Sequence, residues 1–193
     1  MAIPRAAHLN EGSSWRPVKT LTDDACSEWL ASHKIPADPY YSEQTRPPYY
    51  EQFPSPRHAL SSSAVLRSIV TCAEPFETAL LHITDWALYS PDEMAVVEHV
   101  RQSCGDVLPL SQTPGHVFTA AECDLLIGLL ALVTSYGWSA YLYFDHGLTL
   151  LSWEGELLDM WATDSARYNA VCELVQHMGI SSHATGSASH EGS

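Results

Sequence analysis

Three residues in the middle of the chain have side chains that can do acid–base or nucleophilic chemistry: Asp85, Cys104 and His116. A thiol, an imidazole and a carboxylate act together as nucleophile, base and orienting group when a fold brings them within hydrogen-bond distance. The sequence around Cys104, Arg-Gln-Ser-Cys-Gly-Asp, is typical of a helix end and not of a nucleophile signature. We therefore expect no catalytic residues and interpret His116 as a buried residue whose hydrogen bond orders a turn. A small hydrolase that uses Asp85 and His116 is the enzymatic alternative.

Metal and cofactor motifs are absent from the sequence. The ten histidines are scattered, and neither an HExxH nor an HxH pattern occurs. The Gly-rich patterns that bind dinucleotides or nucleoside phosphates are absent as well. The sequence thus predicts no metal site and no cofactor.

The five cysteines are odd in number, widely spaced and without a CxxC pair. A disulfide framework or a zinc ribbon shows tighter spacing, so we expect reduced thiols in a cytosolic protein. The first fifteen residues lack the apolar segment of a signal peptide. The longest apolar run, 125–133, is about half as long as a membrane span requires, and we interpret it as a core helix.

The formal net charge of −14 is concentrated in one part of the chain. Residues 68–166 carry fourteen acidic side chains and a single basic one, Arg101, whereas residues 1–67 carry seven of each. Such a surface repels nucleic acid and anionic membranes and favours a basic protein partner. The plain alternative is that the acidity only maintains solubility.

Asp85 and Trp86 follow an apolar run that we expect to be a buried strand. A carboxylate at the end of a central strand is a common place for a ligand or a catalyst in α/β proteins. Asp85 can equally cap backbone N–H groups of the following loop, with Trp86 packed on the sheet. Fold architecture, a protein-binding surface and catalysis remain open for this pair.

Capping residues and apolar periodicity indicate the elements that must position these side chains. Proline and glycine residues mark the ends of several of them. The predicted helices span 22–34, 58–73, 90–103, 120–136 and 164–178. The predicted strands span 78–84, 138–144 and 148–153, the last two forming a hairpin around residues 145–147, and residues 108–119 are extended. We therefore predict an α/β or α+β fold, a small mixed sheet of about three to four strands covered by about five helices.

The chain divides into three parts by composition. Residues 1–57 hold eight of the twelve prolines and two tyrosine pairs, and we expect an arm with one helix that packs on the domain. Residues 58–180 form the acidic globular domain. The low complexity of residues 181–193 predicts a disordered tail.

A loose set of motifs in residues 78–161 resembles a group of uncharacterised bacterial proteins. The motifs are Thr-Asp-Trp at 84–86, Gly-Asp at 105–106, Pro-Gly-His-x-Phe at 114–118 and Gly-Trp-x-x-Tyr-Leu at 137–142. This group is similar to the immunity-type partners of secreted bacterial toxins. The resemblance implies a small cytosolic inhibitor without catalytic activity.

Charge and resemblance together predict a non-enzymatic, acidic binding protein that neutralises a basic, nuclease-like toxin by occluding its active site. A structural subunit of a larger assembly, with the Pro/Tyr-rich arm as its contact, is a further alternative. The predicted partner-binding residues are carboxylates and tryptophans of the acidic part of the chain. They are Asp85, Trp86, Asp92, Glu93, Asp106, Trp138, Trp153, Glu154 and Glu156.

Overall fold

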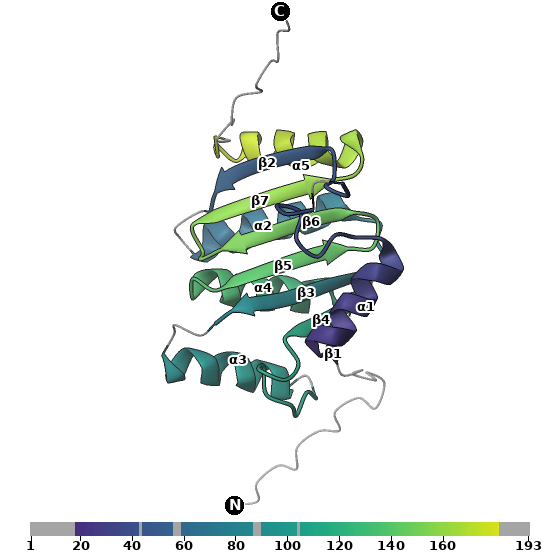
Figure 1. Ribbon diagram of the computed structural model, residues 1–193. Helices are drawn as coiled ribbons and strands as arrows, with labels where there is room; N and C mark the ends of the chain where they lie inside the picture. Colours follow the sequence, from purple (N-terminus) through teal and green to yellow (C-terminus); the bar gives the residue numbers. More distant parts are fainter. Residues whose placement is uncertain (1–17, 43, 56–58, 87–89, 104, 182–193) are drawn as a thin grey trace, which may run out of the picture.

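The computed structural model describes residues 18–42, 44–55, 59–86, 90–103 and 105–181. In this part of the chain seven strands form one antiparallel sheet with the order β1-β4-β3-β5-β6-β7-β2 (Figure 1). The strands are β1 (Lys19–Leu21), β2 (Tyr49–Pro54), β3 (Thr78–Asp85), β4 (Gly115–Thr119), β5 (Ser139–Phe144), β6 (Leu148–Trp153) and β7 (Leu157–Ala162).

Five α-helices of the described chain surround this sheet, and their bounds agree with the predicted helices to within about two residues at most ends. They are α1 (Asp23–His33), α2 (Ala59–Ala73), α3 (Pro91–Ser103), α4 (Cys123–Ser135) and α5 (Ser165–His177); a short 3₁₀ helix, η1 (Ala120–Glu122), precedes α4. In Figure 1, α2, α4 and α5 lie behind the sheet, α1 lies in front of it, and α3 lies beside the β1–β4 edge.

The predicted sheet of three to four strands, mixed in direction, is wrong. The prediction did not include β1, β2 and β7. Every strand pairing is antiparallel, so the sheet is not mixed. β2 was not predicted because it lies in the proline-rich segment. A strand is possible there because β2 is at the edge of the sheet, where Pro54 at its end does not need to donate a ladder hydrogen bond. β7 is buried at five of its six positions, so it lacks the alternation of polar and apolar residues that reveals a half-exposed strand.

The Pro/Tyr-rich segment contributes both edges of the sheet. β1 pairs with β4 at one edge, and β2 pairs with β7 along six residues at the other. The segment therefore packs on the domain and also completes its sheet. The predicted disordered tail, from residue 182 onward, lies outside the described residues.

A large apolar core fills the space between the sheet and the helices behind it. Leu81, Leu142 and Met160 point into it from three strands, and Ile69 and Leu130 reach it from α2 and α4. A smaller cluster, with Cys26, Leu30 and Tyr143, lies under α1 on the other face. α1 approaches closely because Gly115 has no side chain: a Cβ there would stand 2.2 Å from the Cys26 sulfur.

Helix starts and the hairpin agree with the capping patterns of the sequence. The Thr22 hydroxyl accepts a hydrogen bond from the Ala25 N–H, and Thr119 and Glu122 form the predicted capping box. Gly147 closes the β5–β6 turn with a φ of 89°, which favours glycine.

Candidate binding surface

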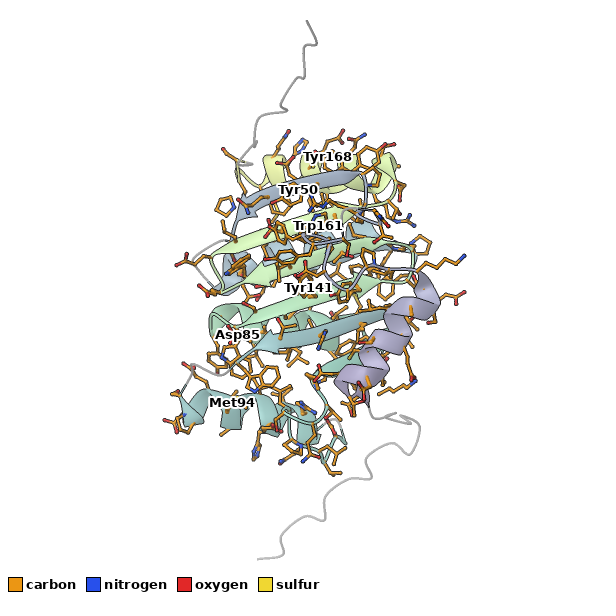
Figure 2. All side chains as sticks on the ribbon, in the orientation of Figure 1. Tyr50, Asp85, Met94, Tyr141, Trp161 and Tyr168 are labelled. Atoms are coloured by element: carbon orange, nitrogen blue, oxygen red, sulfur yellow. The ribbon has the colours of Figure 1, made fainter. Side chains whose placement is uncertain are left out.

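One end of the sheet gathers segments that are far apart in the sequence. Asp85 at the end of β3 lies opposite Ser139 at the start of β5, and Trp153 at the end of β6 lies opposite Leu157 at the start of β7. α3 begins on the same side, as the positions of Asp85 and Met94 show in Figure 2. Five carboxylates predicted as partner-binding lie at this end of the molecule, which we call the acidic end: Asp85 at the end of β3, Glu154 and Glu156 in the β6–β7 turn, and Asp92 and Glu93 in the first turn of α3.

Exposure at the acidic end fits contact with a partner. Asp92, Glu154 and Glu156 are exposed, and Asp85 and Glu93 are half-buried. Within the described residues, the ion pairs of the protein leave Asp92, Glu93, Glu154 and Glu156 without a basic partner. The charges of the exposed Asp92, Glu154 and Glu156 are therefore directed to the solvent and not neutralised locally, whereas one carboxylate oxygen of Glu93 is buried.

Trp153 is the exposed aromatic residue of the acidic end. Its side chain is 47% exposed, and the Tyr40 ring meets it edge-to-face at a centroid distance of 6.4 Å. A tryptophan that keeps half of its surface in water while one side is fixed by a neighbour suits an interface anchor.

The β6–β7 turn that carries Glu154 and Glu156 is held in place by the neighbouring strand. The Glu154 N–H donates to the Ser139 hydroxyl over 3.3 Å, and the Glu156 N–H donates to the Trp153 carbonyl over 2.9 Å. On the other side of Ser139, its carbonyl accepts a hydrogen bond from the Thr84 hydroxyl over 3.3 Å. The ends of β3, β5 and β6 thus form one connected unit, so these carboxylates stand on an ordered frame.

Trp86 has a packing role in the fold. Its side chain is half-buried and packs against the main core, which fixes the chain directly after Asp85. The β3 strand also shifts register between Ile83 and Asp85, as a β-bulge does. Asp85 is therefore held by fold architecture while its half-exposed side chain contributes to the acidic end.

Two predicted partner-binding residues, Asp106 and Trp138, do not belong to this surface. Trp138 is fully buried in the main core. Asp106 is 8% exposed and pairs with Arg101, which also donates to the Thr113 hydroxyl over 2.6 Å. Both residues stabilise the interior, and residue type alone does not separate such a buried aspartate from a surface one.

A cavity of about 680 Å³ opens beside the β6–β7 turn. Its described lining comes from β2 and the residue after it, α2, the end of α4 and the turn itself: Pro54, Ser55, Ser62, Thr134, Ser135, Gly137, Glu154, Gly155, Glu156 and Leu157. Only the two glutamates of this set were predicted as site residues. A serine in a helix or next to a proline does not indicate a pocket in the sequence, because serine side chains usually face solvent or cap helix ends.

The geometry gives little support to the hydrolase alternative. His116 is 2% exposed and lies among Arg101, Asp106 and Phe118. Burial, together with the neighbouring Arg101 guanidinium, lowers the pKa of His116 to about 4. The backbone carbonyl groups of Leu81 and Pro114 act against this lowering of the pKa. An enclosed, neutral imidazole cannot reach a substrate proton in this arrangement. Cys104 lies outside the described residues.

Within the part of the chain that the structure describes, no group of three or more His, Cys, Asp or Glu side chains has a geometry that would hold a metal ion. Among the helices seen, none combines the length and apolar character needed to cross a bilayer. Cys26, Cys72, Cys123 and Cys172 are free thiols.

No protein-family model, no curated protein and no solved structure matches this chain.

Proposed function

We propose that this protein is a non-enzymatic binding protein that neutralises a basic, nuclease-like bacterial toxin in the cytoplasm by occluding its active site. The observation that supports the proposal is the acidic end itself. Exposed carboxylates without local basic partners and a half-exposed tryptophan lie at one ordered end of the sheet.

Electrostatics would bring the partner to this surface. A nuclease cleft presents Lys and Arg side chains to phosphate groups, and carboxylates at fixed positions can take the place of those phosphates. Long-range attraction between opposite charges raises the association rate and falls with ionic strength. Asp92, Glu154 and Glu156 are the exposed charges that would do this.

Trp153 would supply most of the short-range affinity. Interface tryptophans that become desolvated on binding are frequent hot spots, whereas exposed ion pairs at the rim contribute little. The hydrogen bonds that hold the β6–β7 turn reduce the entropy lost on binding, because the turn is ordered before the partner arrives.

The proposal predicts that a neighbouring gene encodes a secreted protein with a toxin-like C-terminal domain, and the test is inhibition of that domain by this chain. Co-expression should restore bacterial growth, and the purified chain should abolish nuclease activity at an equimolar ratio. A variant with Trp153→Ala, Glu154→Gln and Glu156→Gln should lose this protection while remaining folded. Full toxin activity in the presence of excess wild-type chain would refute the proposal.

A further inference from the structure

The cavity beside the β6–β7 turn contains buried polar groups that its own protein does not satisfy. Ser55 and Ser62 are 6% and 3% exposed, and neither side-chain oxygen has a hydrogen-bond partner. The Thr134 hydroxyl, in contrast, is paired with the Ser152 hydroxyl at 3.1 Å. Buried hydroxyls are normally hydrogen-bonded, and both serines line the cavity, so a rotation of either side chain about χ1 would offer its oxygen to a ligand there.

The electrostatic character of the cavity selects a cation. Glu154 and Glu156 stand on one side, and its described lining contains no Lys, Arg or His. α4 ends at the cavity with Thr134 and Ser135, and the C-terminal end of a helix carries a partial negative charge. Two carboxylates, a helix C-terminus and two unpaired hydroxyl oxygens all favour a positively charged hydrogen-bond donor.

The wall between α4 and the turn is built from backbone. Gly155 has a φ of 68°, and a Cβ at this position would stand 2.4 Å from the Thr134 carbonyl oxygen and 3.1 Å from the Gly137 Cα. This close approach sets the two flanking glutamates directly beside the end of the helix. The volume of about 680 Å³ lies within the range of roughly 300–1,000 Å³ typical of ligand-binding pockets.

We infer that this cavity receives an arginine side chain of the basic partner. A guanidinium group is planar and carries five N–H donors, so it can pair with a carboxylate in a bidentate manner and still donate to serine hydroxyls. Glu154 and Glu156 would pair with the guanidinium charge at the opening of the cavity, and the Ser55 and Ser62 hydroxyls would accept hydrogen bonds from the remaining N–H groups. The inference rests on the proposed function only for the source of the arginine, a toxin that inserts it.

A small-molecule titration tests the cavity without the toxin. The probe is N-acetyl-L-arginine amide, followed by the amide signals of Ser55, Ser62 and Gly155 in the NMR spectrum of the full chain. N-acetyl-L-citrulline amide has the same shape without the charge and is the matched probe. We expect saturable shifts at these three residues with the arginine probe and none with the citrulline probe. Equal shifts with both probes, or no saturable shift with either, would overturn the inference.

Variants assign the binding to the residues of the cavity. Glu154→Gln combined with Glu156→Gln should lower the affinity for the arginine probe by about tenfold, because two hydrogen bonds lose the charge of their acceptor. Glu28→Gln, an exposed position of α1, is the matched control and should leave the probe affinity unchanged. Ser62→Leu should fill the cavity and abolish binding. If that variant does not fold, the double glutamine variant decides: unchanged affinity would contradict the inference.

The toxin experiment and the probe experiment have independent outcomes. A chain that binds the arginine probe but does not inhibit the toxin retains the cavity inference and refutes the proposed function. A chain that inhibits the toxin equally well with and without Glu154→Gln and Glu156→Gln, and that binds no probe, retains the function and refutes the cavity inference.

Discussion

Arg101 and Asp106 form an ion pair in the interior of the protein, with 2.9 Å between Arg101 Nε and Asp106 Oδ2. The side chains are 1% and 5% exposed. Asp106 also accepts a hydrogen bond from the Leu108 N–H over 3.1 Å, and Arg101 donates to the Leu108 carbonyl over 3.2 Å. The pair thus ties the end of α3 to the loop that leads into β4.

Asp106→Ala should lower the free energy of unfolding by about 3–5 kcal/mol, because it leaves the Arg101 guanidinium buried without a counter-charge. Urea unfolding followed by circular dichroism measures this change. Asp92→Ala, at an exposed position in the first turn of α3, is the control and should cost less than about 1 kcal/mol. Similar losses in both variants would contradict a structural role for Asp106.

His116 should make the stability of the protein depend on pH. Its pKa is lowered from 6.5 to about 4 by burial and by Arg101. The unfolded chain therefore binds this proton more readily than the folded protein between these two pH values. The free energy of unfolding is therefore not reduced by this group above about pH 6.5. It falls as the pH is lowered, by about 2 kcal/mol between pH 7 and pH 5.

The measurement compares urea unfolding of the wild type and of His116→Met at pH 7 and pH 5. Methionine adapts to the buried site without a titratable group, so the difference between the two proteins isolates the imidazole. We expect the wild type to lose more stability than the variant on acidification. Parallel losses would mean that His116 keeps an ordinary pKa in the folded protein.

The helices were predictable because their starts and ends are local. Thr22, Thr119 and Asp164 each provide a side-chain oxygen at the start of a helical segment, and such caps depend on three or four neighbouring residues. The β5–β6 hairpin was predictable for the same reason, since Gly147 occupies its turn. Short edge strands such as β1 depend on partners about a hundred residues away and carry no comparable signal.

The acidic end could be predicted only in part. The charge excess identified Glu154 and Glu156 as surface residues, but their position at the same end of the sheet as Asp85 follows from the register of β3, β5 and β6. Asp106 and Trp138 were assigned to the surface because residue type alone does not reveal burial. Ser55 and Ser62 were missed because their importance arises from a cavity between distant elements.

Trp138 and Trp153 should respond in opposite ways to replacement by alanine. Trp138→Ala removes a fully buried side chain of the core and should cost about 3–5 kcal/mol of stability. Trp153→Ala should cost less than about 1 kcal/mol of stability, because the side chain is 47% exposed, yet weaken toxin binding by about 2 kcal/mol or more. Thermal unfolding and calorimetric titration with the toxin separate the two effects. A folded Trp153→Ala variant with wild-type affinity would exclude this residue from the interface.

Two glycines, Gly155 in the β6–β7 turn and Gly128 in α4, should give opposite results when changed to alanine. Gly155 has a φ of 68°, and an added Cβ would clash with the Thr134 carbonyl oxygen at 2.4 Å. Gly155→Ala should therefore destabilise the protein by about 1–3 kcal/mol and displace the β6–β7 turn from α4. Gly128 lies on the exposed side of α4 with nothing within 4 Å of an added Cβ, so Gly128→Ala should stabilise the protein by about 0.5–1 kcal/mol through helix propensity. Urea unfolding of both variants measures the signs. A neutral Gly155→Ala variant with an unchanged Glu154 amide signal would show that the turn does not pack against the end of α4 in solution.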